Sequence, residues 1–257
     1  MMFLGDHESY FYDTFKQKQS VLFANMINGI NAGCSILYIA GEEDTDTMQT
    51  KLGNLGLKKG DQKKLKIVTS YQWYTPDGDF DPRRVIDQYR SLIDEALDNG
   101  FAGLYVSADA ADTFDYLLKK GIINEWLDYE GSLGTTFKFP MEAICAYKKE
   151  QVISSGEILL QLLKGHKHTI SDKTEKRILN EQMIRGTVFQ EFKKIFGNTI
   201  ANVIFDNLDD ILLAQNFSQP NDEKFYYLLE SIQKEGDSRL FSRIEQNILK
   251  RLYTEIS

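Results

Sequence analysis

Short apolar runs alternate with longer amphipathic segments through the first 165 residues of the chain. Apolar residues cluster in four runs that predict buried strands at 35–40, 64–69, 103–107 and 143–147. Between these runs, apolar side chains recur at the 3.6-residue spacing of helices, which are predicted near 15–32, 44–55 and 82–99. Strands that alternate with helices are typical of βαβ units. The sequence therefore predicts an α/β fold, a parallel sheet with helices on both faces.

The helix near 82–99 has the clearest boundaries. Asp81 can accept hydrogen bonds from the first backbone amides of the helix, and Pro82 suits the first helical position because that amide needs no partner. Gly100 suits the end of the helix. We therefore predict that this helix begins directly after Asp81.

The pattern changes near Thr169, after which no strand-like run is evident. Helices are predicted near 173–196, 198–214, 222–234 and 238–256. We therefore expect two domains, an α/β domain at 1–168 and a smaller all-α domain at 169–257. The last helix places its apolar side chains on one face, at Leu240, Ile244, Ile248, Leu252 and Tyr253. Because a domain of this size has a small core, we expect this face to contact a second copy or a protein partner, or else to pack within the domain.

Composition and charge narrow the classes of protein. No apolar run approaches the length of a membrane span, and the first residues lack the pattern of a signal peptide, so we expect a cytoplasmic protein without a membrane partner. Cys34 and Cys145 are the only cysteines and are expected to be small core residues. The net charge is −8 and no basic stripe is present, so we do not expect DNA as a partner.

Paired carboxylates follow the strand predicted at 35–40. Glu42 and Glu43 stand between this strand and the next helix. The arrangement resembles the second strand of RecA/KaiC-type ATPases, in which a glutamate at this position orients the water that attacks the γ-phosphate. The alternative is structural, because acidic side chains at a helix N-terminus interact favourably with the helix dipole.

The loop that should hold the phosphates has no glycine. Such ATPases need the pattern G-x-x-x-x-G-K-[ST], whose glycines let backbone amides surround the phosphates. The corresponding segment here is 12–20, where Lys18 falls near the lysine position but bulky side chains replace the glycines. Asp109 resembles the magnesium-binding carboxylate of these enzymes at the end of its strand. We therefore expect no nucleotide, no cofactor and no catalysis.

A further resemblance covers about residues 5–170. It is carried, in order, by Gly5-Asp6-His7, Phe11-Tyr12, Cys34–Ile39, Asp79-Phe80-Asp81-Pro82, Gly100–Leu104, Tyr129-Glu130, Cys145-Ala146-Tyr147 and Leu162–His166. This pattern resembles MEDS domains, sensory domains named after methanogens, methylotrophs and the regulator DcmR, which are similar to KaiC-type folds without the phosphate loop. The chain departs from the family pattern at Ala108-Asp109-Ala110, where a glutamate and an aromatic residue are usual, and at Lys167, where proline is common.

Residues 180–257 have a second resemblance. Phe192–Gly197, Ile204–Leu208 and Ile248–Tyr253 are similar to the small helical output domains, of NitrOD type, found in ammonia-oxidising archaea. This resemblance implies signal transduction and does not name the downstream partner.

The candidate ligand site lies where the strands end, because open parallel sheets bind ligands at the carboxyl ends of their strands. The candidate residues are His7, Tyr12, Glu42, Glu43, Tyr71 and Asp109. His7 matches the early histidine of MEDS domains, although a lone histidine is often structural. His166 and His168 have a spacing that does not place both on one helix face, so no metal site is expected there.

The function that these observations favour is a non-catalytic sensory protein. Its α/β domain would receive a small molecule or a protein signal and pass it to the helical domain. Two alternatives stay open: a divergent KaiC-like ATPase that uses Lys18 with Glu42 or Glu43, and a transcription regulator.

Overall fold

The computed structural model describes residues 5–41, 45–54, 64–152, 155–171 and 176–206, together with 246–248, 250–251 and 254. The chain divides into two compact units, Met1–Arg177 and Ile178–Ser257. Among the described residues, no helix is both long and apolar enough to cross a membrane.

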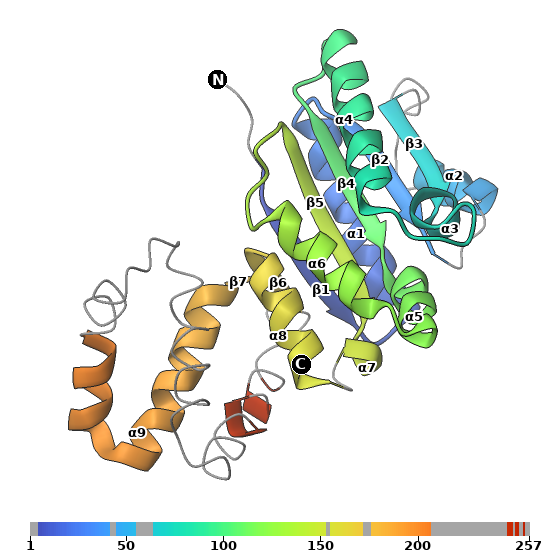
Figure 1. Ribbon diagram of the computed structural model, residues 1–257. Helices are drawn as coiled ribbons and strands as arrows, with labels where there is room; N and C mark the ends of the chain where they lie inside the picture. The colour runs from blue at the N-terminus through green and yellow to red at the C-terminus, as the bar shows by residue number, and fades with distance from the viewer. Residues whose placement is uncertain are drawn as a thin grey trace. The chain divides into compact units, whose positions relative to one another are not determined.

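A single sheet forms the centre of the first unit (Figure 1). Its strands are β1 (His7–Tyr12), β2 (Ser35–Ala40), β3 (Leu65–Thr69), β4 (Leu104–Asp109), β5 (Met141–Lys148), β6 (His168–Ser171) and β7 (Lys176–Leu179). They lie in the order β3-β2-β4-β5-β1-β6-β7, and every pairing from β3 to β6 is parallel. The four predicted strands are all present in this sheet, as β2, β3, β4 and β5.

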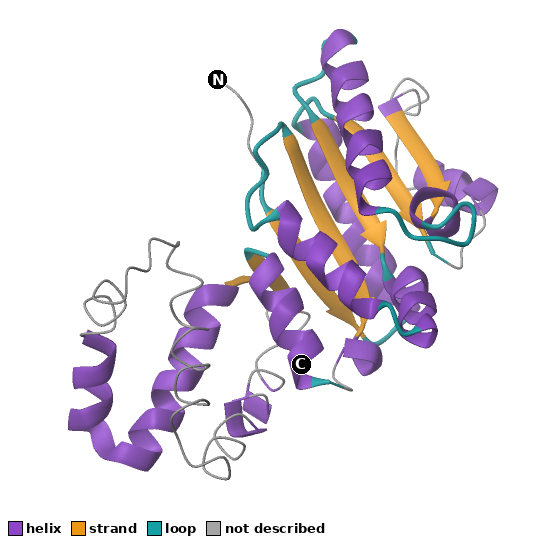
Figure 2. Ribbon diagram, in the orientation of Figure 1, coloured by secondary structure: helices purple, strands orange, loops and turns teal. Residues whose placement is uncertain are grey.

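Helices cover both faces of the sheet, as Figure 2 shows. They are α1 (Phe15–Asn31), α2 (Thr45–Asn54), α3 (Ser70–Tyr74), α4 (Pro82–Asp98), α5 (Ala111–Lys120), α6 (Ile123–Leu133), α7 (Lys149–Val152) and α8 (Gly156–Gly165). One face is covered by α1, and the opposite face is covered by α4, α6 and α8 (Figure 1). The predicted α/β sandwich is therefore confirmed.

The start of α4 agrees with the prediction from Asp81. The Asp81 side chain accepts hydrogen bonds from the backbone amides of Arg83, at 3.0 Å, and Arg84, at 3.4 Å, and Pro82 is the first helical residue. This cap satisfies amides that have no partner inside the helix.

The alternation of side chains along β1 and β5 separates two cores. Tyr10 and Tyr12 of β1 and Ile144 of β5 pack into the core beneath α1. Because successive side chains of a strand point to opposite faces, His7 and Cys145 point to the other face, where α6 and α8 lie. That second core is strongly aromatic, with close ring contacts among Tyr74, Phe80, Trp126, Tyr129, Phe114 and Tyr147.

Three strands of the sheet, β1, β6 and β7, are not apparent in the hydrophobic pattern. The expectation that no strand follows Thr169 is wrong, because β6 and β7 extend the sheet beyond this residue. The first strand, β1, was missed because three of its six buried residues are polar. Such side chains are tolerated there because they find polar partners; Ser9 Oγ, for example, lies 2.9 Å from Thr169 Oγ1 of β6.

The second unit is helical over its described residues from 180 onward. Helix α9 (Asn180–Asp206) is kinked at Gly197, whose φ of 81° only glycine adopts readily. The helix predicted from 173 begins only at Asn180, because the residues before it form β7. The predicted helix at 222–234 and most of the apolar face at 238–256 fall outside the described residues.

An ion pair near the C-terminus lies within this unit. The Arg251 Nε donates to Glu191 Oε1 of α9 at 2.8 Å. Glu191 is itself buried and also accepts from Lys194 Nζ at 2.8 Å. Ile248, on the predicted apolar face, is 2% exposed. At Arg251 the C-terminal segment therefore contacts its own unit.

Candidate functional site

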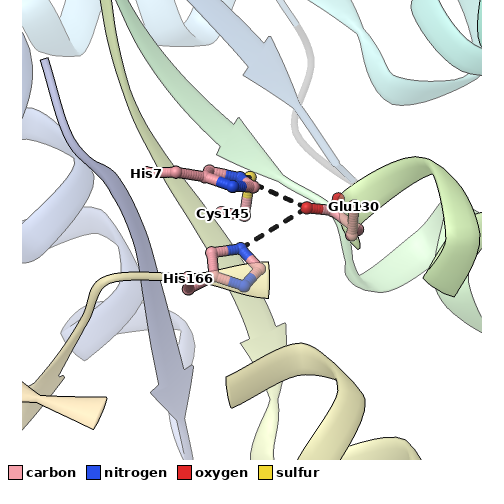
Figure 3. Close-up of side chains that lie close together, drawn as sticks. All are labelled: His7, Glu130, Cys145 and His166. Carbon is pink, nitrogen blue, oxygen red and sulfur yellow. Dashed lines mark hydrogen bonds and ion pairs between the residues drawn. The ribbon is translucent and has the colours of Figure 1, made fainter. Parts of the chain in front are cut away.

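Four buried side chains from distant parts of the sequence converge between the sheet and its covering helices. They are His7, Glu130, Cys145 and His166, and their ligand atoms all lie within 4.8 Å of one another (Figure 3). None is more than 5% exposed. We refer to these four residues as the histidine cluster.

Each member of the histidine cluster is held by a different element. His7 is the first residue of β1, and Cys145 lies in β5, the strand paired with β1. Glu130 lies near the end of α6, and His166 caps the C-terminal end of α8. Because α6 and α8 pack on this face, the glutamate and His166 meet the two strand residues over the sheet.

The Glu130 carboxylate lies at the centre of the histidine cluster. Its Oε2 is 3.2 Å from His7 Nε2 and 3.4 Å from His166 Nε2. Cys145 Sγ lies 3.5 Å from His7 Nε2. The two imidazole rings stack with their centroids 3.9 Å apart.

Backbone carbonyls fix the orientation of both imidazoles. His7 Nδ1 lies 2.9 Å from the carbonyl oxygen of Gly165 and 3.2 Å from that of Gly134. His166 Nδ1 lies 2.6 Å from the carbonyl oxygen of Leu162. Since a carbonyl only accepts hydrogen bonds, each Nδ1 carries a proton, and the Nε2 of each ring faces Glu130.

Burial keeps two members of the cluster uncharged. It lowers the pKa of His166 well below its ordinary value of 6.5, and the neighbouring His7 adds to this effect. Burial also raises the pKa of the Cys145 thiol well above its ordinary value of 9.0, and the charge of Glu130 contributes. Neutral imidazole, thiolate sulfur and carboxylate oxygen are all ligands for transition metals.

Asp6, Glu8 and His168 form a second group of side chains that could bind a metal, but this group is partly exposed. His168 Nδ1 is 3.5 Å from Glu8 Oε1 and 3.6 Å from Asp6 Oδ2. Lys167 Nζ donates to Asp6 Oδ1 at 2.8 Å, so a cation of the protein already neutralises part of this acidic group. It is therefore a weaker candidate for a bound ion than the histidine cluster.

The crevice predicted at the carboxyl ends of the strands contains a buried ion pair. Lys18 Nζ donates to Asp109 Oδ2, and both residues are 2% exposed. Asp109 Oδ1 also accepts from the Tyr12 hydroxyl at 3.3 Å and from the Ala111 amide at 3.2 Å. Lys18 further lies over the ring of Phe15, with Nζ 4.6 Å from the ring centroid.

Residues of the first turn of α1 cap the N-terminus of this helix. The Thr14 side chain accepts from the Gln17 amide, and the Gln17 side chain accepts from the Thr14 amide, which forms a capping box. Across the crevice, a Cβ at position 41 would overlap the Asp109 carboxylate, so only glycine fits there. The cavity that remains has a volume of about 190 Å³ and is lined by Tyr12, Asp13, Phe15, Lys18, Asp109, Asp112, Lys148 and Glu150.

Comparison with known protein families identifies the first unit. The pattern of the methanogen/methylotroph and DcmR sensory domain, MEDS, matches residues 6–167. The chain belongs to the MEDS family. This assignment confirms the resemblance drawn from the motifs and gives the protein a sensory domain. No curated protein matches the chain closely enough to serve as a relative.

The MEDS domain brings together only part of the predicted ligand site. Tyr12 and Asp109 meet at the carboxyl edge of the sheet, whereas Tyr71 is 57% exposed on α3. Glu42 and Glu43 lie outside the described residues. His7 and Tyr12 are the first and last residues of β1. At a rise of about 3.3 Å per residue their backbone positions are about 16 Å apart, so His7 does not lie at the same edge of the sheet as Tyr12.

Three members of the histidine cluster were missed as functional candidates. Glu130 was not considered, Cys145 was expected to be a small core residue, and a metal site at His166 was not expected because its partner was sought only at His168. Each residue nevertheless lies within a motif of the MEDS resemblance: Tyr129-Glu130, Cys145-Ala146-Tyr147 or Leu162–His166. Their order in those motifs was a usable signal, but sequence spacing alone could not indicate that they meet.

Proposed function

We propose that this protein is a non-catalytic sensor. In this proposal the MEDS domain is a P-loop-type fold of the RecA/KaiC kind that has lost its nucleotide site, and it receives a small molecule or a protein signal in the cytoplasm. The helical second unit acts as an output domain of NitrOD type and transmits the signal to a partner.

The observation that carries the proposal is the buried pair of Lys18 and Asp109. In a P-loop ATPase, the corresponding lysine contacts the phosphates and the corresponding carboxylate serves the magnesium ion. Here the two charges satisfy each other, so a nucleotide would have to separate a buried ion pair before it could bind. Separating such a pair costs about 3–5 kcal/mol, which weakens binding by a factor of roughly 100 to 4,000.

The backbone at this site also favours loss of the nucleotide. Phosphate binding needs free amides at the N-terminus of the helix that follows the loop. The capping box of Thr14 and Gln17 already occupies two of the amide groups at the start of α1. The adjoining cavity, about 190 Å³, is smaller than the roughly 300–1,000 Å³ of typical cofactor pockets, and suits a small polar ligand.

Nucleotide titration tests the proposal against the ATPase alternative. We expect isothermal titration of the full chain with Mg·ATP to give no saturable heat, and a coupled assay to give no phosphate release. Micromolar binding together with turnover that Glu42→Gln abolishes would refute the proposal and establish a divergent ATPase. The matched control is Glu125→Gln, which changes a carboxylate on α6 that does not line the cavity.

A further inference from the structure

The histidine cluster gathers four potential metal ligands around one buried carboxylate. Both imidazole Nδ1 atoms lie against backbone carbonyl oxygens, and both Nε2 atoms lie against the same oxygen, Glu130 Oε2. The Tyr147 hydroxyl also interacts with the Glu130 carboxylate. A cation at the centre of the cluster would interact favourably with the buried carboxylate and with both Nε2 atoms at once.

The distances within the cluster are those of a metal coordination shell. Zinc binds nitrogen and oxygen at about 2.0–2.2 Å and sulfur at about 2.3 Å, so a tetrahedral site has edges of about 3.3 Å between nitrogen and oxygen and about 3.6 Å between nitrogen and sulfur. The observed edges are 3.2 and 3.4 Å from the imidazole nitrogens to Glu130 Oε2, and 3.5 Å from His7 Nε2 to Cys145 Sγ. The remaining separations are at most 4.8 Å, so small side-chain shifts would complete the tetrahedron.

We propose that His7, Glu130, Cys145 and His166 form a four-ligand site for a divalent transition metal of the zinc class. Two neutral imidazoles, one thiolate and one carboxylate give a ligand set of charge −2, which cancels the charge of the ion. A neutral complex is what a fully buried site requires. The nitrogen and sulfur ligands select zinc-class ions over calcium and magnesium, which prefer oxygen.

The surroundings of the cluster complete this site. The carbonyls of Gly165 and Leu162 hold the imidazoles in the tautomer in which Nε2 can bind an ion, the usual outer-shell arrangement of metal-bound histidine. The ring centroids of Phe137 and His7 lie 5.2 Å apart, and those of Tyr147 and His166 lie 6.2 Å apart, so aromatic rings flank the site. Binding displaces the thiol proton of Cys145 to solvent, and the bound ion links α6 and the end of α8 to strands β1 and β5.

Metal content of the intact protein tests this proposal, which does not depend on the proposed loss of the nucleotide site. The full chain is expressed in minimal medium supplemented with zinc or with cobalt, and its metal is measured by mass spectrometry. Because the cluster is buried, the ion should enter during folding and survive purification with chelator. We expect about one equivalent per chain, with five-fold or greater loss in Cys145→Ser and His166→Ala.

Two matched control variants distinguish metal bound at the histidine cluster from metal bound elsewhere in the protein. Cys34→Ser removes a buried thiol outside the cluster, and His168→Ala removes the histidine of the neighbouring acidic group. Both variants should keep the full equivalent of metal. Loss of the metal in His168→Ala with retention in His166→Ala would overturn the proposal, because the ion would then belong to Asp6, Glu8 and His168.

Spectroscopy of the wild-type protein keeps the test independent of whether the variants fold. The cobalt form should show the absorption bands of a tetrahedral ion and a thiolate-to-cobalt charge-transfer band. X-ray absorption of the zinc form should show one sulfur at about 2.3 Å among nitrogen and oxygen ligands at about 2.0–2.2 Å. A folded wild-type protein that contains no transition metal from either medium, or a cobalt form without the charge-transfer band, would overturn the proposal.

Discussion

Neutralising Lys18 should destabilise the first unit far more than neutralising an exposed lysine. In Lys18→Met the Asp109 carboxylate stays buried without its ammonium partner, and removal of one member of a buried pair costs about 3–5 kcal/mol. Asp109 keeps two donors, the Tyr12 hydroxyl and the Ala111 amide, so we expect the lower end of this range, about 3 kcal/mol. That change lowers the folding equilibrium constant roughly 100-fold.

The double variant Lys18→Met/Asp109→Asn distinguishes an ion pair from simple packing. It removes both charges, while the asparagine oxygen can still accept from the Tyr12 hydroxyl and the Ala111 amide. Replacing a buried pair by neutral groups is often close to neutral for stability, so we expect the double variant to lie within about 1 kcal/mol of the wild type. The two single variants should therefore be strongly non-additive.

Tryptophan fluorescence during urea unfolding measures this effect. Trp73 and Trp126 are the only tryptophans, and both are buried in the first unit, so the signal reports unfolding of that unit alone. The matched control is Lys119→Met. Lys119 pairs with Asp115 one turn away on the exposed face of α5, and this change should cost less than about 0.5 kcal/mol. The reasoning would be refuted if Lys18→Met cost no more than this control, or if the double variant were as unstable as the single variants.

Three further predictions test local features of the structure. Asp81→Ala removes the cap of α4 and should cost the first unit about 1 kcal/mol in the same titration; an unchanged midpoint would contradict the cap. Burial, with a contribution from Glu142, raises the pKa of Cys34 to about 11, so at pH 8 iodoacetamide should label it roughly 100-fold more slowly than free cysteine; rapid labelling in a peptide map would contradict this. Arg251→Met leaves the buried Glu191 with one cation fewer and should speed hydrogen exchange of the α9 amides roughly tenfold; the exposed Lys250→Met is the control, and equal exchange in both variants would contradict the packing of Arg251 against α9.

Elements whose signals are local could be predicted from the amino-acid sequence. The four apolar runs became β2, β3, β4 and β5. The inner strands β2, β4 and β5 require apolar side chains at nearly every position because they are buried on both faces, whereas β3 lies at the edge of the sheet and is less buried. The start of α4 was predictable because Asp81 and Pro82 act on amides only a few residues away. The absence of glycine between Tyr12 and Gly29 is likewise a local fact, and from it we predict that no phosphate loop forms.

The burial of polar residues depends on contacts between distant parts of the chain and could not be predicted from the sequence. His7, Glu8 and Ser9 obscured β1 because a pattern of polar residues gives no sign of partners that lie more than 100 positions away in the chain. The same holds for the crevice at the carboxyl ends of the strands. The sequence suggested separate roles for Lys18 and Asp109, whereas in the fold the two side chains form an ion pair.

The histidine cluster shows the physical reason most clearly. Along the chain, 123 positions separate His7 from Glu130, 15 separate Glu130 from Cys145, and 21 separate Cys145 from His166. Strand pairing of β1 with β5 and packing of α6 against α8 bring them within 4.8 Å. Sequence spacing reports only neighbours along one helix or strand, whereas the chemistry of this site arises from the meeting of four separate elements.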